Sequence, residues 1–137
     1  MRFPLFRSTR WGRLPRFLLA GGVATLFHWL TMLVLIGWGL NAVFATATGA
    51  AVGLLANYFG QHRYAFCSDL PHRVALPRYL TGAALGWVLN LAGFSLLLIA
   101  GLSVAPSQII TTALIAFANY LFAQRFVFHE EQTINVQ

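Results

Sequence analysis

Four long apolar runs follow one another along the chain, and the charged residues fall only between or beyond them. The runs contain no Asp, Glu, Lys or Arg and extend over about Phe17–Trp38, Ala42–Gln61, Tyr79–Ala100 and Val104–Gln124. Each run is long enough to cross about 30 Å of hydrocarbon as an α-helix that rises about 1.5 Å per residue. The pattern therefore predicts an all-α membrane protein with four transmembrane helices.

The ends of these runs carry further signals. The first run is too long for the apolar part of a cleaved signal peptide, and no A-x-A-like cleavage site follows it. Pro15 and Pro106 lie where the first and fourth helices are expected to begin, because the first turn of a helix tolerates a residue without an N–H.

The composition agrees with a membrane protein and argues against a soluble one. Apolar residues make up 58% of the 137 residues and charged residues 9%, well below the roughly one quarter that is usual for soluble chains. The net charge of +6 is compatible with nucleic acid binding. The hydrophobicity makes a membrane the better explanation of this charge, so we expect no nucleic acid partner. The single cysteine, Cys67, excludes an intrachain disulfide, and no Cys/His cluster of the metal-binding kind is present in the sequence.

The charges fall on one side of the predicted helices, because the links after the first and third helices carry none. The charged residues are Arg2, Arg7, Arg10, Arg13, Arg16, Arg63, Asp69, Arg73, Arg78, Arg125, Glu130 and Glu131. Since positively charged loops stay in the cytoplasm, both termini are predicted to be cytoplasmic. The regularly spaced N-terminal arginines are interpreted as a topology signal that also contacts anionic lipid headgroups, with a role in substrate binding as the alternative.

One string of ten residues occurs twice, as NYFGQHRYAF at 57–66 and as NYLFAQRFVF at 119–128. The identical pairs are 62 residues apart; they are Asn57/Asn119, Tyr58/Tyr120, Arg63/Arg125 and Phe66/Phe128. The same shift places Arg16 on Arg78 and Gly39 on Gly101. A repeated unit of two helices returns the chain to its starting side, so the two copies are expected to be parallel, as in some transporters.

The repeat defines the predicted domain organisation. We expect a single membrane domain over 1–137, with one repeat at about 16–66 and the other at about 78–128. A basic N-terminal segment, 1–15, and a polar C-terminal tail, 129–137, flank the repeats. A repeat that serves packing alone is the alternative to a repeat that builds a transport path.

Small residues four apart form stripes on the predicted helices, and the stripes recur after the shift. On the first and third helices, Ala20, Ala24 and His28 correspond to Gly82, Gly86 and Asn90. On the second and fourth, Ala45, Gly49, Gly53, Asn57 and Gln61 correspond to Ser107, Thr111, Ile115, Asn119 and Ala123. Such stripes allow helices to approach closely in lipid, so these faces are predicted to turn inward.

Four polar residues within the helices are candidates for contact with a polar headgroup: His28, Asn90, Asn57 and Asn119. A polar group without a partner is costly in hydrocarbon, so all four are expected to face the interior. His28 and Asn90 either form interhelical hydrogen bonds, with each other among the options, or line a path for the headgroup. Asn57 and Asn119 either bond to a neighbouring backbone or bind a sugar hydroxyl or phosphate oxygen.

Arg63 and Arg125 end the second and fourth apolar runs in the same R-x-x-F context, preceded by Gln61 and Gln124. These two glutamines are further candidates for contact with the headgroup. One reading is an arginine at a helix end that reaches towards water. The repeated context favours a built site, because a guanidinium forms a planar fork that pairs with phosphate oxygens. We therefore predict that both arginines bind a lipid phosphate. The flanking rings are predicted to form an interfacial aromatic belt, and they are Tyr64, Phe66, Phe126 and Phe128.

R-F-L-L-x-G-G at Arg16–Gly22, together with the two N-Y-x-x-x-x-R-x-x-F strings, resembles the GtrA-like family of small bacterial membrane proteins over about Arg16–Phe128. The resemblance implies a protein of the bacterial inner membrane that translocates a polyprenyl-phosphate-linked sugar, such as undecaprenyl-phosphate glucose, to the outer leaflet. A glycosyltransferase pathway of cell-surface polysaccharide (O-antigen) synthesis then uses the sugar. The matching motif positions are Asn57, Arg63, Phe66, Asn119, Arg125 and Phe128, with His62 and Gln124 just before the arginines.

Three alternatives are weighed against this function. An enzyme is disfavoured, because no acidic residue lies in a predicted helix and no nucleophile–base pair is readable. A small-multidrug-type exporter is disfavoured for the same lack of an intramembrane carboxylate. A membrane scaffold that anchors a glycosyltransferase and transports nothing stays open. Four helices make a thin wall around any path, so a homo-oligomer is a further expectation.

Overall fold

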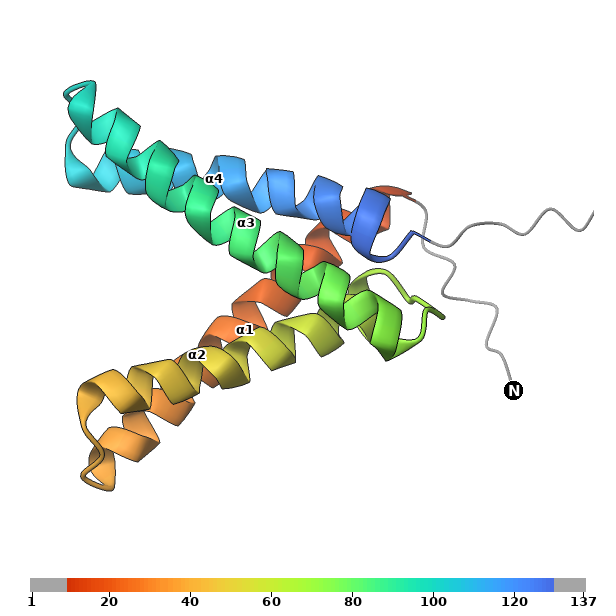
Figure 1. Ribbon diagram of the computed structural model, residues 1–137, viewed down its shortest axis with the longest axis horizontal. Helices are drawn as coiled ribbons and strands as arrows, with labels where there is room; N and C mark the ends of the chain where they lie inside the picture. Colours follow the sequence, from red (N-terminus) through yellow and green to blue (C-terminus); the bar gives the residue numbers. More distant parts are fainter. Residues whose placement is uncertain (1–9, 130–137) are drawn as a thin grey trace, which may run out of the picture. The chain divides into compact units, whose positions relative to one another are not determined.

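The structure, a computed structural model, describes residues 10–129 and is α-helical over most of that range (Figure 1). Its elements are α1 (Arg10–Gly37), α2 (Ala42–Phe59), the π-helical turn η2 (Gly60–Ala65), α3 (His72–Ile99), α4 (Val104–Phe122) and the π-helical turn η3 (Ala123–Val127). Four of these helices, the second and fourth including their π-helical turns, are long and apolar enough to cross a membrane. The prediction of an all-α protein with four transmembrane helices is confirmed.

The first and third helices extend further on their charged side than the apolar runs indicate. Helix α1 is already helical at Arg10, and α3 begins at His72. Pro15 and Pro77 consequently lie inside these helices, so the prediction that Pro15 marks the start of the first helix is wrong. The helical backbone continues past the apolar segment because its hydrogen bonds do not depend on side-chain hydrophobicity. Pro106, in contrast, lies in the first turn of α4, as predicted.

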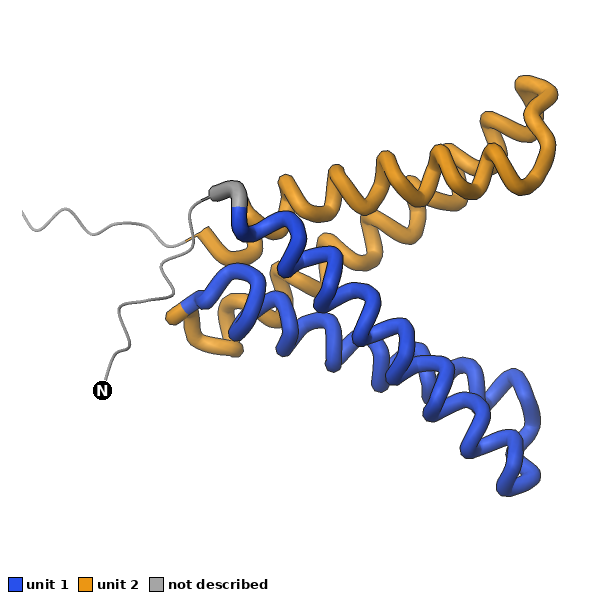
Figure 2. The backbone as a smooth tube through the Cα atoms, turned by 180° about the vertical axis from the view of Figure 1, so that it is seen from behind, with its two compact units in different colours: residues 1–68 blue, residues 69–137 orange. Residues whose placement is uncertain are grey.

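Two compact units divide the chain, Met1–Ser68 and Asp69–Gln137 (Figure 2). The described part of each unit is a helical hairpin, with α1, α2 and η2 in the first and α3, α4 and η3 in the second. Both hairpins pack their two helices along the predicted small-residue faces, as the contacts below show.

A glycine in a left-handed conformation closes each hairpin turn. Gly39 has a φ of +87° and Gly101 a φ of +92°, values that other residues adopt only with strain. Just beyond Gly39, the amide of Leu40 donates to the carbonyl of Leu35 at 3.0 Å, and the corresponding bond in the second hairpin has the same length. These bonds satisfy carbonyl groups that the end of a helix leaves free.

In the first hairpin, glycines on α2 allow its backbone to approach α1 closely. A Cβ added at Gly49 would lie 2.6 Å from the carbonyl oxygen of His28, and one at Gly53 would lie 3.0 Å from that of Ala24. The predicted inward faces of these two helices therefore do meet.

In the second hairpin, the glycines lie on the other helix. A Cβ added at Gly82 would lie 2.7 Å from the ring of Phe122, and one at Gly86 would lie 2.6 Å from the side-chain oxygen of Asn119. A large or polar side chain of α4 thus covers each glycine of α3. The two hairpins therefore pack along equivalent helix faces. In the first hairpin the glycines of this interface are on α2, and in the second they are on α3.

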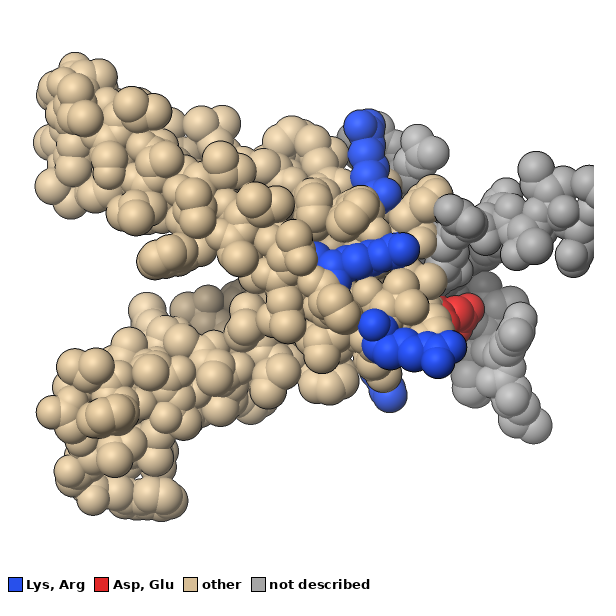
Figure 3. All heavy atoms as spheres, in the orientation of Figure 1, with Lys and Arg blue, Asp and Glu red and all other residues tan. Residues whose placement is uncertain are grey.

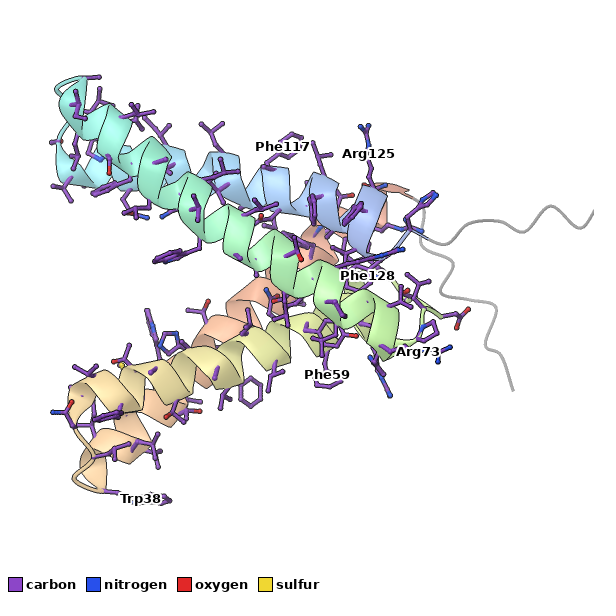
Figure 4. All side chains as sticks on the ribbon, viewed as in Figure 1. Trp38, Phe59, Arg73, Phe117, Arg125 and Phe128 are labelled. Carbon is purple, nitrogen blue, oxygen red and sulfur yellow. The ribbon has the colours of Figure 1, made fainter. Side chains whose placement is uncertain are left out.

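The outer faces of the helices carry large apolar side chains, among which Trp38, Phe59 and Phe117 are labelled in Figure 4. Trp38, next to the first turn, is 81% exposed, and Phe117, on α4, is 55% exposed. A soluble protein rarely exposes so much apolar surface. Lipid is the solvent that such faces fit.

Candidate functional site

In each hairpin, the charged side chains that the structure describes lie at the helix ends away from the glycine turn (Figure 3). The motif strings reach this same end, because α2 and α4 run towards it from the turns. We describe it as the basic end of each hairpin, defined by Arg16 and 57–66 in the first and by Arg78 and 119–128 in the second. The basic end is the candidate functional site.

A π-helical turn lies within each motif string. The amide of Phe66 donates to the carbonyl of Gln61, and that of Phe128 donates to the carbonyl of Ala123, both at 2.9 Å. These bonds span five residues instead of the four of an α-helix, so the turn is wider. After η2, Cys67 has a left-handed φ of +48°, which ends the helix. Short π-helical stretches are frequent at functional sites.

Arg63 and Arg125 occupy equivalent places in these wide turns. Both side chains are exposed, and Figure 4 shows Arg125 extending away from the end of its helix. Neither guanidinium has a hydrogen bond or an ion pair with any residue in the described range 10–129. Such a group is available to an anion from outside the chain. Binding of a lipid phosphate by these residues stays a prediction.

The first hairpin buries the residues beside Arg63. Gln61 is 4% exposed and His62 is 5% exposed, and the His62 ring lies 5.7 Å from that of Tyr58. The side-chain amide of Gln61 donates to the side-chain oxygen of Asn57 at 3.2 Å. The first hairpin therefore holds two of the predicted headgroup-binding amides in one hydrogen-bonded pair.

In the second hairpin, the corresponding residues make different contacts. Asn119 is half-buried, and its amide group lies flat against Gly86, since both its oxygen and its nitrogen are within 2.7 Å of an added Cβ there. Ala123 takes the place of Gln61, so the amide pair of the first hairpin has no counterpart. Gln124 is half-buried within η3.

His28 and Asn90 lie well inside α1 and α3 and are both half-buried. The imidazole of His28 packs against α2, because its Cδ2 would lie 2.8 Å from a Cβ at Gly49. No hydrogen bond to this imidazole is found among residues 10–129. An interhelical hydrogen bond of His28 and a role in lining a path both stay predictions.

The four motif aromatics divide into an exposed and a buried pair. Tyr64 is 48% and Phe126 is 51% exposed, which fits the predicted aromatic belt. Phe66 and Phe128 are each 7% exposed, and Phe66 packs edge-on against Phe17 with 6.3 Å between ring centroids. The π-helical turn rotates the last motif residue inward, so the buried pair does not form a belt.

The structure brings Arg16 and Arg78 to the motif strings. The sequence offered substrate binding by Arg16 only as an alternative and assigned no site role to Arg78. The guanidinium carbon of Arg16 lies 5.6 Å from the ring centroid of Tyr64, and that of Arg78 lies 5.6 Å from the ring centroid of Phe126. Arg78 also donates from Nη1 to the carbonyl oxygen of Phe126 at 3.3 Å. The available signal was the shift of 62 residues, which relates the two arginines and also the two rings.

Metal chemistry receives no support from the described residues. Within 10–129, no three His, Cys, Asp or Glu side chains come together as a metal site would require. The basic ends instead offer guanidinium, amide and aromatic groups. Their chemistry suits an anionic group at a membrane surface.

Four membrane-spanning helices in two hairpins define a small multi-pass membrane protein. The family model of the GtrA/DPMS transmembrane domain matches residues 16–128, so the chain belongs to this family. The family is one of sugar-lipid translocation and is generally a non-catalytic transmembrane domain. Comparisons with curated proteins and with solved structures give no match.

Proposed function

We propose that this protein flips a polyprenyl-phosphate-linked sugar, such as undecaprenyl-phosphate glucose, from the cytoplasmic to the outer leaflet of the bacterial inner membrane. Both termini lie in the cytoplasm, and the sugar serves a glycosyltransferase pathway that modifies cell-surface polysaccharide. The protein acts as a transporter and not as an enzyme. The observation that carries the proposal is the pair of exposed guanidinium groups, Arg63 and Arg125, at the same place in two hairpins of this family.

The chemistry of such a lipid matches the basic ends. Its phosphate is an anion at the membrane surface, and a guanidinium fork binds phosphate through two parallel hydrogen bonds. Arg63 and Arg125 have no other partner within residues 10–129, so binding breaks no existing ion pair. The prenyl tail remains in the lipid, which also surrounds the exposed apolar faces of the helices.

The sugar needs polar contacts as it crosses the hydrocarbon. In our proposal, Asn57, Asn119, His28 and Asn90 provide them, with Gln61 and Gln124 near the entrance. Support comes from their positions: His28 and Asn119 both lie on packing faces within their hairpins, where lipid is excluded. A path built from such faces keeps the headgroup away from the acyl chains.

The test is leaflet exchange of labelled polyprenyl-phosphate glucose in proteoliposomes that contain this protein alone. We expect exchange with the wild type and its loss in the double variant Arg63→Ala/Arg125→Ala. Arg73→Ala is the matched control, because Arg73 is also exposed in the basic region but lies outside both motif strings. Its exchange rate should remain within about twofold of the wild-type rate, because an exposed charge outside the site contributes little.

A wild-type protein that is folded but moves no lipid would contradict the proposal. The scaffold function would then be the better candidate. The large apolar faces favour it as the second choice, because they offer a helical partner the same surface that they offer lipid. Co-purification of one glycosyltransferase from a membrane extract, in a fixed ratio, would support the scaffold.

A further inference from the structure

The first helix of each hairpin contributes an arginine that the proposed function does not use. Arg16 of α1 lies over the ring of Tyr64, and Arg78 of α3 lies over the ring of Phe126, with the same distance of 5.6 Å. Each ring directly follows a motif arginine in the sequence. The same cation–aromatic contact is thus built twice, next to the two proposed phosphate-binding residues.

In the second hairpin, Arg78 contacts the π-helical turn at two points. Besides the ring contact, Arg78 donates to the carbonyl oxygen of Phe126 at 3.3 Å. Carbonyl groups in the last turn of a helix lack intrahelical partners, and a cation there is favoured by the helix dipole. The ring of Phe122 also packs against that of Phe126, with 5.0 Å between ring centroids. The residue after Arg125 is therefore held through both its ring and its backbone.

The motif arginine itself has no such restraint. Arg125 is exposed and has no hydrogen bond within residues 10–129, so the direction of its side chain depends on the backbone of η3. A π-helical turn is a less regular support than an α-helix. No side-chain hydrogen bond caps the start of η3. What holds Phe126 therefore also determines where Arg125 points.

We infer that Arg16 and Arg78 are positioning residues, each fixing the π-helical turn of its own hairpin so that Arg63 or Arg125 faces the lipid phosphate. The inference rests on the proposed phosphate-binding role of the motif arginines. It assigns Arg16 a task beyond the topology signal expected from its sequence context. Each guanidinium acts through the aromatic residue that it covers, Tyr64 or Phe126.

The first test measures binding of undecaprenyl monophosphate to the full-length protein in nanodiscs. We expect Arg78→Gln to raise the Kd about five- to thirtyfold, less than the loss of Arg125 itself, because a positioning residue affects binding only through the residue that it positions. Phe126→Leu should have a similar effect, whereas Phe126→Tyr should bind normally, because Tyr64 fills this place in the first hairpin. Arg73→Gln removes the same charge from the same helix and should change the Kd by less than about twofold.

A double-mutant cycle separates positioning from direct binding. In the background of Arg125→Ala, Arg78→Gln should weaken binding by less than about twofold further, because the residue that it positions is already gone. Losses that multiply would mean that Arg78 contacts the phosphate independently, and this would overturn the inference. Arg16→Gln in the background of Arg63→Ala repeats the cycle in the first hairpin. If an Arg78 variant failed to fold, the cycle in the first hairpin would still test the inference.

Amide hydrogen exchange supplies a readout that needs no lipid. Arg78→Gln should accelerate exchange at 123–128 and leave 108–118 of α4 unchanged, whereas Arg73→Gln should alter neither segment. Unchanged exchange at 123–128 would overturn the inference whatever the binding data show. If exchange accelerates as expected but the wild type binds no polyprenyl phosphate, the proposed function fails and the positioning contact stands.

Discussion

The residues of the basic ends are of two kinds. Some are buried or hydrogen-bonded within their hairpin, and others are exposed and available to a ligand. Phe66 and Phe128 are buried, and Asn57 and Gln61 bond to each other. The guanidinium of Arg63, in contrast, lies in the last turn of η2 and has no hydrogen bond to any residue within 10–129. A side chain that the fold does not use is the one whose replacement should change function and leave stability intact.

Replacement of the motif arginines by lysine tests whether their shape matters as well as their charge. We expect Arg63→Ala and Arg125→Ala each to weaken polyprenyl-phosphate binding roughly ten- to hundredfold, the contribution of a hydrogen bond to a charged group. Lysine should recover only part of this loss, because an ammonium group lacks the planar fork. Titration of the detergent-solubilised variants with undecaprenyl monophosphate provides the measurement.

The lysine variants also distinguish a binding site from an anchor at the membrane surface. An arginine that merely reaches towards water is replaceable by any long cation. Full recovery of binding by lysine would therefore reject the fork as the recognising group. The thermal stability of all four variants should stay close to that of the wild type, since neither side chain is part of the packing.

At the same scale, the sequence identified the residues of the motif but not all of their roles. Arg63 and Arg125 were identified because identical residues at a fixed spacing can be recognised in the sequence alone. The role of Arg78 depends on a contact between residues 48 apart, which only the closed hairpin creates. The burial of Phe66 follows from the π-helical turn, and a turn that departs from the period of 3.6 has no signal in hydrophobic periodicity.

Among the elements, the hairpin is the unit whose stability the small residues determine. Glycines of α2 in the first hairpin and of α3 in the second remove the Cβ atoms that would keep the helices apart. In lipid there is no hydrophobic force between helices, so close packing of this kind supplies much of their attraction. The sequence predicted these faces correctly, because spacing by four residues places side chains on one face of any α-helix.

We predict that Gly49→Ala destabilises the first hairpin. The added Cβ would lie 2.6 Å from the carbonyl oxygen of His28, closer than such atoms approach, so α1 and α2 must separate. Overpacking of this kind costs about 1–3 kcal/mol. The free energy of unfolding, measured by titration of the purified protein with a denaturing detergent, should fall by this amount.

Gly22→Ala is the matched control for this prediction. Gly22 lies in α1, but nothing is within 4 Å of a Cβ added there. Alanine also has the higher helix propensity. The control should therefore be as stable as the wild type or slightly more stable, and equal losses in both variants would show that the packing face is not where the structure places it.

On the scale of the whole molecule, sequence alone predicts the topology that a flippase requires. The charged residues fall on one side of the four helices, whereas the links at the glycine turns carry none. The positive-inside rule predicts that the basic ends face the cytoplasm, where our proposal has the sugar lipid captured. The fold class followed from the sequence because length and hydrophobicity decide it. The parallel arrangement of the two hairpins, which the repeat predicts, stays a prediction.

The single cysteine makes this topology measurable without a foreign reporter. Cys67 is exposed in the link between η2 and α3. We predict that a membrane-impermeant maleimide labels it in inverted inner-membrane vesicles and not in spheroplasts. In a Cys67→Ser background, Trp38→Cys and Ser103→Cys should show the opposite pattern, because each lies at one of the uncharged turns.

The two introduced cysteines give this experiment its resolving power, because they report on one hairpin each. Equal labelling of all three sites in both preparations would mean that the chain inserts in both orientations. The reverse labelling pattern would place the basic ends outside the cytoplasm. Arg63 and Arg125 would then face the leaflet to which the lipid is delivered, and not the leaflet from which it is taken. If Trp38→Cys and Ser103→Cys reacted from opposite sides, the two hairpins would not be parallel, and one headgroup would no longer be able to reach both arginines from the cytoplasm.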